Sequence, residues 1–327
     1  MPRLARFAWG LLGYDIAVVA WGAYVRATGS GAGCGRHWPL CNGEVIPRAP
    51  HVATIVELSH RVSSGISLVL TVALFVWALR AYPRGHLVRR AAGATTAFMF
   101  GEALLGAGLV LFELVAHDAS MKRALSVSLH LVNTFLLLGS TALTAWWASG
   151  GAPVRLRGRR AVALVVGVPL AAMFFVGASG AVTALGDTLF PAKSLAAGLA
   201  QDFAPGAHVF IRLRVLHPVL AATTAVAIVA SAGIVRALRP TRAVRLLSYA
   251  AVALVVAQVG LGLLDIAMRA PTALQLAHLA VADAVWIALV LTGAAALGEP
   301  QPAIMSRNGA APSSEVPPST SSVAPVM

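Results

Sequence analysis

Eight apolar runs, each long enough to cross a bilayer, constrain the fold of this chain more than any other feature. A helix needs about 20 mostly apolar residues to span the hydrocarbon core of a membrane. The runs cover residues 6–26, 54–79, 91–113, 123–148, 161–183, 208–235, 244–266 and 272–297. The sequence therefore predicts an all-α integral membrane protein with eight transmembrane helices.

The composition excludes several classes of soluble protein. Of the 327 residues, 58% are hydrophobic and 11% are charged, whereas a soluble domain carries about 25% charged residues. An ordinary soluble enzyme, a disordered chain and a nucleic-acid-binding domain are therefore excluded. The first run follows Arg3 and Arg6, so a signal peptide is the alternative for that run. Its length and its place in the repeat described below favour a transmembrane helix.

The net charge of +13 is unevenly divided between the loops. Arginines crowd the N-terminus and the loops after the second, fourth and sixth runs, whereas the other loops mix basic and acidic residues. The crowded positions are Arg3, Arg6, Arg80, Arg84, Arg89, Arg90, Arg155, Arg157, Arg159, Arg160, Arg236, Arg239, Arg242 and Arg245. The positive-inside rule places such loops in the cytoplasm, next to an anionic leaflet. Both termini are therefore predicted to be cytoplasmic.

The two halves of the chain repeat weakly. Short motifs of the second, third and fourth runs return in the same order in the sixth, seventh and eighth runs. The pairs are Glu57-Leu-Ser-His60 with Arg214-Val-Leu-His217, Glu102-Ala-Leu-Leu-Gly106 with Gln258-Val-Gly-Leu-Gly262, and His130 with His278. This order predicts a parallel repeat of two four-helix bundles, residues 1–150 and 151–298. The tail, residues 299–327, is rich in Pro and Ser and is expected to be disordered and cytoplasmic.

Four histidines lie inside predicted helices, two in each half, at similar depths below the outer boundary. They are His60, His130, His217 and His278. Ionisable groups inside a membrane are costly and often functional. Paired imidazoles in a four-helix bundle can hold a haem iron from both axial sides. The alternative is that each histidine hydrogen-bonds a neighbouring helix. Zinc is disfavoured because no Cys, Asp or second His stands at ligand spacing.

Charged residues beside these histidines differ between the halves. Glu57 precedes His60 by three residues, so both lie on one helix face. The matching position in the other half is Arg214, with Arg212 close by. The two arginines could pair with haem propionates or meet lipid headgroups, and Glu57 could simply extend to the membrane surface.

The first outer loop contains both cysteines of the chain. Cys34 and Cys41 face the oxidising side, where they can form a disulfide. An eight-residue ring would stabilise the fold by roughly 2.5 kcal/mol on a loop-entropy basis. The spacing is not that of a redox C-x-x-C motif, so a structural staple and a redox role both stay open.

In order and spacing, these motifs resemble the haem A synthases, membrane enzymes that act on haem O during cytochrome oxidase assembly. The resemblance covers about residues 5–297. It is carried by Gly33-Cys34 through Trp38-Pro39-Leu40-Cys41-Asn42-Gly43, by Glu57-Leu-Ser-His60-Arg61, by His130-Leu-Val-Asn133 and by His278. Three features depart from the family pattern: Pro218 replaces the usual Arg after the third histidine, residues 184–207 hold no second cysteine pair, and Glu102 replaces Gln.

The resemblance implies an oxidoreductase that acts on a CH group in the inner (plasma) membrane, converting a methyl group of haem O to a formyl group. His60 and His130 would hold the substrate haem O, with Glu57 as the catalytic carboxylate. His217 and His278 would bind a haem b cofactor, with Arg212 or Arg214 near its propionates. Cys34 and Cys41 match the family's outer-loop pair. A haem O synthase is the implied partner, while the electron acceptor and a homo-oligomer stay open.

The ligand set also bears on mechanism and on rival functions. If His60 and His130 both bind the iron, no position is open for oxygen, which favours water as the oxygen source with Glu57 handling a proton or a developing cation. Departure of one histidine during turnover is the alternative. A bis-His b-type cytochrome that only relays electrons would need the histidines but not Glu57. A transporter is disfavoured by four histidines at one depth.

Overall fold

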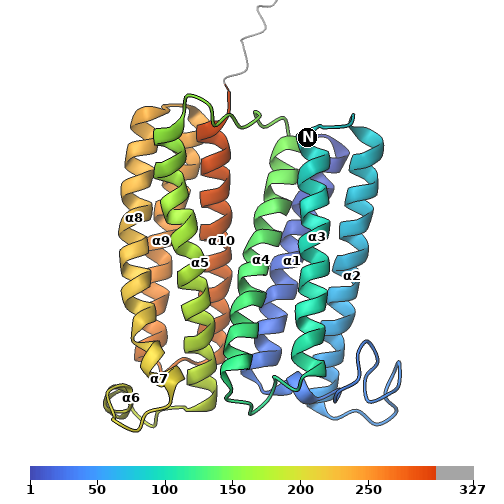
Figure 1. The fold of residues 1–327 in the computed structure, drawn as a ribbon, viewed down its shortest axis with the longest axis vertical. Coiled ribbons are helices and arrows are strands. Elements are labelled where there is room, and N and C mark those ends of the chain that lie inside the picture. The colour runs from blue at the N-terminus through green and yellow to red at the C-terminus, as the bar shows by residue number, and fades with distance from the viewer. Residues whose placement is uncertain (300–327) are drawn as a thin grey trace, which may run out of the picture.

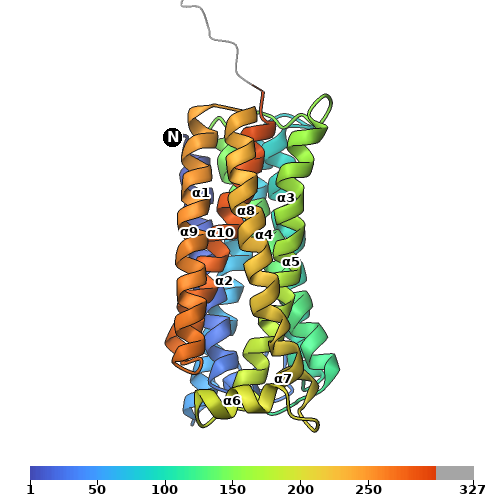
Figure 2. The same ribbon diagram turned by 90° about the vertical axis from the view of Figure 1, so that its left-hand side faces the viewer.

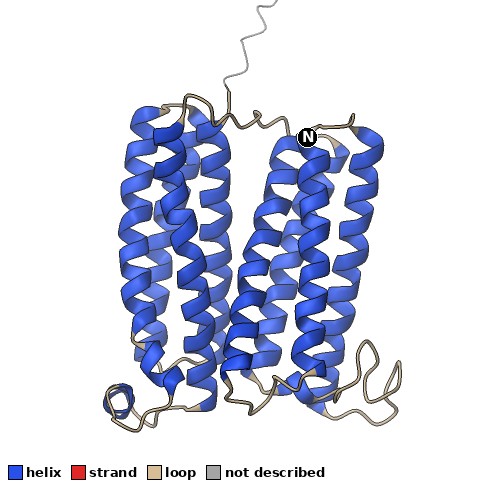
Figure 3. Cartoon of the chain, in the orientation of Figure 1, coloured by secondary structure: helices blue, strands red, loops and turns tan. Residues whose placement is uncertain are grey.

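The computed structural model describes residues 1–299, and these form an all-helical molecule (Figures 1 and 3). No β-strand occurs within this part of the chain. The predicted tail lies outside the described residues from position 300 onward. The all-α prediction is therefore confirmed for the part of the chain that the structure describes.

Eight helical segments within residues 1–299 are long and apolar enough to cross a membrane. Their bounds agree with the predicted runs to within a few residues, and the protein is a multi-pass membrane protein. They are α1 (Arg3–Ala27), α2 (Val52–Ala81), α3 (Leu87–Leu111), α4 (Met121–Ala148), α5 (Arg160–Leu189), α7 with α8 (Val209–Arg214 and Leu216–Leu238), α9 (Arg242–Ala267) and α10 (Thr272–Leu297). A short turn, η1 (Ser30–Ala32), and the helix α6 (Leu195–Asp202), in the connection between α5 and α7, complete the described elements.

The sixth transmembrane segment is broken at Val215, between α7 and α8. Pro218 explains the break, because proline has no N–H for the carbonyl group of Arg214 and its ring clashes with that carbonyl. The helix restarts at Leu216, which places His217 in the first turn of α8. The interruption thus lies directly beside one of the predicted iron ligands.

The long helices form two groups of four, α1–α4 and α5 with α8–α10 (Figure 1). In the first group α1 and α3 each pack against α2 and α4, so α2 and α4 lie diagonally opposite each other. In the second group α5 and α9 each pack against α8 and α10, so α8 and α10 are the diagonal pair. The predicted division into residues 1–150 and 151–298 and the repeat itself agree with this grouping but remain predictions.

Aromatic side chains fill the contact between the two groups. The rings of Phe135 on α4 and Trp286 on α10 stack with centroids 5.2 Å apart, and Phe174 on α5 lies 5.0 Å from Trp286. The indole N–H of Trp286 donates to the carbonyl oxygen of Phe135 at 2.5 Å. This contact fixes α10 against α4 and thereby orients the two groups of helices that carry the histidines.

The chain enters and leaves the helical part at one end of the molecule. Figure 1 shows the N-terminus and the end of α10 at that end, with the disulfide loop and α6 at the opposite end. Figure 2 shows α6 lying across the end of the second group, below α8 and α9. Both long connections that precede a predicted ligand helix, α2 and α8, therefore lie on the same side.

Candidate haem-binding site and its carboxylate

In the first helical group, each predicted iron ligand packs against a glycine of the neighbouring helix. A Cβ atom added to Gly22 on α1 would come within 2.8 Å of His60 Cε1, and one added to Gly106 on α3 would lie 3.6 Å from His130 Nε2. At Gly22 any larger residue would collide with the imidazole, because real Cβ atoms essentially never approach so closely. The glycines leave room for both imidazoles in the interior of the group.

The second helical group repeats this arrangement. A Cβ atom at Gly180 on α5 would lie 3.0 Å from His217 Cε1, and one at Gly262 on α9 would lie 3.1 Å from His278 Cε1. In both groups the histidines occupy the diagonal helices and the glycines occupy the helices between them. This recurrence supports the predicted repeat. It also gives each of the four histidines the same kind of neighbour, a glycine on the adjacent helix, which the sequence motifs alone did not show.

The distance between the second pair of histidines suits a shared metal ion. The ring centroids of His217 and His278 lie 6.4 Å apart with planes at 79°. Two imidazoles that bind one metal from opposite sides, each through a bond of about 2.0–2.1 Å, have ring centres roughly 6 Å apart. The Nδ1 atoms of His60 and His278 are buried and have no hydrogen-bond partner among the described residues. Such atoms are rare in folded proteins, and both pairs therefore fit a bound group that uses imidazole nitrogen.

Within residues 1–299, no three His, Cys, Asp or Glu side chains gather in a way that could hold a metal ion by themselves. The interior of each group offers two imidazoles instead. A two-histidine haem site requires no third protein ligand. The available side chains therefore match the predicted ligand set of His60, His130, His217 and His278, whose roles remain proposals.

Glu102 on α3 is the polar neighbour of His130. Its Oε2 atom lies 2.8 Å from His130 Nδ1, an ion-pair distance that falls short of full hydrogen-bond alignment. Its Oε1 atom accepts from the Asn133 amide at 2.7 Å and from the Thr134 hydroxyl at 3.1 Å. Asn133, which follows His130 by three residues, thus holds the carboxylate that contacts His130.

Neutral groups take the corresponding places in the second half. Gln258 on α9 lies with its amide nitrogen 3.1 Å from His278 Nε2. The hydroxyl of Ser179 on α5 lies 3.1 Å from His217 Nδ1. Glu102 and Gln258 each stand four residues before the glycine that faces a histidine. The repeat had matched these two positions in sequence, but it did not show that both side chains contact histidines.

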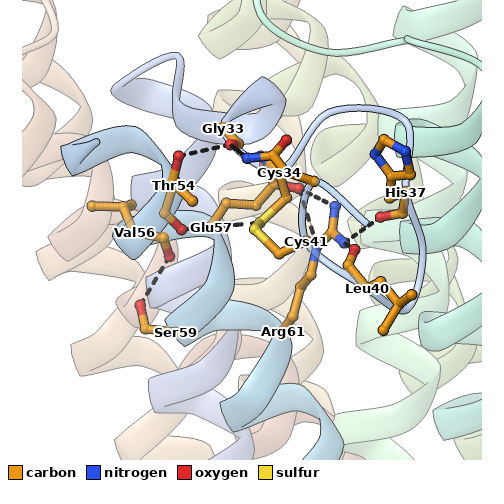
Figure 4. The surroundings of a disulfide bond; sticks show 11 residues. Gly33, Cys34, His37, Leu40, Cys41, Thr54, Val56, Glu57, Ser59 and Arg61 are labelled. Carbon is orange, nitrogen blue, oxygen red and sulfur yellow. Dashed lines mark hydrogen bonds and ion pairs between the residues drawn. A yellow bond between two sulfur atoms is a disulfide. The ribbon is translucent and has the colours of Figure 1, made fainter. Parts of the chain in front are cut away.

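Glu57 is buried near the N-terminal end of α2, with 3% of its surface exposed. Its Oε2 atom accepts the backbone N–H of Cys34 at 2.8 Å, and its Oε1 atom accepts from Arg61 Nε at 3.1 Å and Nη2 at 2.5 Å (Figure 4). Hydrogen bonds to an ionised carboxylate are roughly twice as strong as neutral ones. Glu57 therefore does not extend to the membrane surface but joins α2 to the loop above it.

Arg61 extends this network into the loop. Its Nη1 atom donates to the carbonyl oxygens of His37 at 2.5 Å and Leu40 at 2.6 Å (Figure 4). A planar guanidinium with five donors suits such a convergence of acceptors. Arg61 follows His60 directly in sequence. Sequence reasoning assigned it no role, because its two partners in the loop lie more than twenty positions away.

The predicted disulfide between Cys34 and Cys41 is present. Both cysteines are fully buried. The Thr54 hydroxyl donates to the carbonyl oxygen of Gly33 at 2.7 Å, which ties the ring to α2. A Cβ atom at Gly33 would approach the backbone of Ala53 to 2.4 Å, so only glycine permits this contact. The ring thus holds the Cys34 N–H on Glu57.

The comparison with known proteins agrees with this geometry. Residues 5–290 match the family COX15-CtaA, described as cytochrome oxidase assembly protein. The chain belongs to this family. A protein of Thermus thermophilus named protoheme IX farnesyltransferase is 50% identical over 295 residues, which are 90% of this chain and 48% of that protein. The chain thus spans about half the length of this curated relative, and a second Thermus thermophilus protein of the same name matches equally.

Shorter matches carry a different name. The heme A synthase of Alkalihalophilus pseudofirmus is 41% identical over 97 residues, 30% of this chain and 33% of that protein. The heme A synthase of an Exiguobacterium species is 38% identical over 121 residues, 37% of this chain and 40% of that protein. Similarity to proteins of this name agrees with the resemblance noted from the motifs.

The oxidation state of the cysteine pair in this family member can be tested by alkylation. We expect Cys34 and Cys41 to resist a membrane-impermeant maleimide after denaturation without reductant, because a disulfide leaves no thiol to react. After reduction both should be labelled, as measured by the mass shift. Two labelled thiols before reduction, in protein from an oxidising compartment, would contradict the bridge as the native state.

The two arginines predicted to meet propionates lie near α6. The Arg214 guanidinium donates to Asp187 at 2.7 Å and also pairs with Asp202. Arg212 donates to the carbonyl oxygen of Pro205. Two carboxylates thus compensate the charge of Arg214 and hold α6 against α5 and α7. The role of both arginines toward a haem remains a prediction, with Arg212 the less engaged of the two.

Arg26, at the C-terminal end of α1, was missed by sequence reasoning. Its Nη1 atom donates to the carbonyl oxygen of Ala184 at 2.8 Å and the Thr188 hydroxyl at 3.1 Å, and its Nη2 atom donates to Gln275 Oε1 at 3.0 Å. These acceptors belong to α5 and α10 of the other half. Arg26 therefore links the two halves of this family member at the level of the predicted sites.

Proposed function

We propose that this protein is a haem A synthase, which oxidises a methyl group of haem O to a formyl group for use in cytochrome oxidase. The observation that carries the proposal is the combination of two interior histidine pairs with the buried carboxylate of Glu57, one helical turn before His60 on α2. Acidic groups near one histidine pair, Glu57 and Glu102, with Arg214 and Gln258 at the matching positions of the other half, suit a protein that modifies one haem and uses the other for electron transfer. Membership in the cytochrome oxidase assembly family supports the same function.

In this proposal the two halves divide the work. His60 and His130 on the diagonal helices α2 and α4 hold the substrate, haem O. His217 and His278 hold a haem b, which supplies a redox centre that accepts and passes on single electrons. The glycine at each histidine and the unpartnered Nδ1 atoms of His60 and His278 support this assignment.

Glu57 provides the acid–base chemistry in this proposal. The Cys34 N–H donates to one of its oxygens and Arg61 to the other. The carboxylate of Glu57 can take up a proton from a reacting water molecule or stabilise positive charge that develops at the edge of the substrate ring. Oxidation of the methyl group releases protons as well as electrons, so a nearby base serves each oxidation step.

The proposed partner is an enzyme that makes the substrate. The Thermus thermophilus relatives are named protoheme IX farnesyltransferase, and this chain corresponds to about half of their length. We propose that the chain receives haem O from such an enzyme within the plasma membrane. The distribution of arginines supports an orientation with both termini in the cytoplasm and the disulfide loop outside.

The alternative function is a bis-His b-type cytochrome that relays electrons without modifying a haem. The near-identical glycine–histidine packing in both halves favours it, because a relay needs two similar sites and no catalytic carboxylate. A haem A synthase produces haem A, whereas an electron relay leaves its haems unchanged, so the test must identify the haems that the protein yields.

Co-expression with a haem O source tests the proposal. The protein would be produced in a host that lacks haem A, with and without a farnesyltransferase that supplies haem O, and the haems would be extracted and identified by mass. We expect haem A only when both the chain and the haem O source are present. Bound haem without any formyl product would contradict the enzyme and establish the electron relay.

A further inference from the structure

We infer that Glu102 sets the iron site of the first half to a lower reduction potential than that of the second half. The inference rests on the proposed function, since it requires a haem iron at each histidine pair. It concerns a positioning residue, because Glu102 acts through His130 and not on the reacting atoms. The structural basis is a difference between two otherwise matching sites.

Glu102 accepts hydrogen bonds at Oε1, and its Oε2 atom faces His130. The Asn133 amide and the Thr134 hydroxyl both lie within donating distance of Oε1, at 2.7 and 3.1 Å, while His130 Nδ1 lies 2.8 Å from Oε2. An ionised carboxylate accepts hydrogen bonds at both oxygens and donates none. The carbonyl oxygen of His130 is also bonded by the Thr134 hydroxyl at 3.0 Å, so Thr134 ties the carboxylate and the backbone of α4 together.

The matching contact in the second half is neutral. Gln258 occupies the place of Glu102 and lies 3.1 Å from His278 Nε2. The amide nitrogen of Gln258 can only donate to that ring nitrogen, whereas the oxygen of Glu102 faces His130 Nδ1. The amide carries no net charge. The two sites therefore offer the same ligand type, the same glycine packing and a different charge beside the fourth-helix histidine.

The charge changes the electronic character of the ligand. A carboxylate that accepts the N–H of a metal-bound imidazole raises the basicity of that imidazole. A more basic ligand stabilises the oxidised iron, and haem potentials depend on such hydrogen bonding around the axial ligand. We therefore expect the iron held by His60 and His130 to be the more easily oxidised of the two.

This order of potentials suits the proposed reaction. Electrons removed at the substrate haem move downhill only if the second haem has the higher potential. Glu102 thus favours electron transfer from the first half to the second, whereas a glutamine in its place would make the two sites alike and remove that preference.

A reciprocal exchange tests the inference, because the chain contains both versions of the contact. Glu102→Gln gives the first half the neutral partner, and Gln258→Glu gives the second half the charged one. Midpoint potentials would be measured by spectroelectrochemical titration at one fixed pH. Protein made without haem O reports the second site, and the signal that appears only with haem O reports the first.

We expect Glu102→Gln to raise the midpoint potential of the site in the first half, and Gln258→Glu to lower that of the site in the second half. Each change should be at least tenfold in the ratio of reduced to oxidised iron, which corresponds to about 59 mV. Glu113→Gln is the matched control, because Glu113 is a largely exposed carboxylate that pairs with Arg36. It should shift neither potential. A role in packing alone would lower haem content or thermal stability without this opposite pair of shifts.

The outcomes separate the inference from the proposed function. If the purified protein binds no low-spin haem, the proposed function fails. If haem is bound but neither exchanged variant changes its ratio of reduced to oxidised iron by more than twofold from wild type, the inference fails while the proposed function stands. If the Glu102→Gln protein loses the haem of the first half, the Gln258→Glu protein still tests the inference, because the second half takes up its haem without haem O.

Discussion

Replacing His217 or His278 by alanine is expected to abolish the low-spin haem spectrum of the second half while the protein still inserts into the membrane. Each substitution removes one of the two imidazoles whose rings lie 6.4 Å apart, and a single remaining imidazole cannot hold the iron in a bis-His state. Alanine is a better helix former than histidine, so α8 and α10 should form as before. The absorbance and electron paramagnetic resonance spectra of the purified variants provide the measurement.

Ser179→Ala is the matched control for this prediction. It removes the hydroxyl 3.1 Å from His217 Nδ1 but leaves both imidazoles in place. Loss of one hydrogen bond typically costs about 1 kcal/mol, so the low-spin spectrum should remain, with at most a modest shift. Full retention of that spectrum in both the His217→Ala and the His278→Ala proteins would exclude the assignment of these residues as ligands.

The transmembrane architecture could be predicted from sequence because it depends on local physics. A run of about 20 apolar residues must satisfy its backbone internally, and only a helix does so within one segment. The break between α7 and α8 is equally local, since Pro218 disrupts the preceding turn. The extension of α5 to Leu189 was missed because Gly186 and Asp187 interrupt the apolar pattern. There tertiary contacts of Asp187 with Arg214 decide the helix end.

The candidate site was only partly predictable. The histidines stand out because a titratable group in an apolar run is unusual. Their partners do not, because Glu102, Arg61 and Arg26 make contacts with other helices or with a distant loop. Glu102, for instance, reaches α4 and its partner Asn133 across thirty-one positions. Such pairings depend on helix rotation and register, which single-sequence patterns do not determine.

The glycines illustrate the same limit in a different way. Gly22, Gly106, Gly180 and Gly262 lie among many glycines in apolar helices, and most of them need no special explanation. Their role becomes visible only when the neighbouring helix places an imidazole against each of them. A repeat in sequence therefore indicated which positions correspond, while the structure was needed to show which of them touch.

Glu57→Gln is expected to preserve haem binding and to lower the rate of haem O oxidation by about 10²–10⁴-fold, the usual effect of losing a general base. Glutamine keeps an oxygen for the Cys34 N–H, which lies 2.8 Å from Glu57 Oε2, so the disulfide loop should stay in place. What is lost is the negative charge and the ability to take up a proton. The measurement is the yield of haem A against bound haem O after co-expression with a haem O source.

Arg61→Gln separates the chemistry of Glu57 from its structural contacts. Both substitutions break the same ion pair, in which Arg61 Nη2 lies 2.5 Å from Glu57 Oε1, and breaking a buried pair by removing one partner destabilises by about 3–5 kcal/mol. If Glu57 only anchors the loop, the two variants should lose activity and thermal stability together. If its carboxylate handles a proton or a developing cation, Arg61→Gln should lose stability but keep far more activity than Glu57→Gln. Equal haem A yields from Glu57→Gln and wild type would remove Glu57 from the reaction and leave it as a tie between α2 and the outer loop.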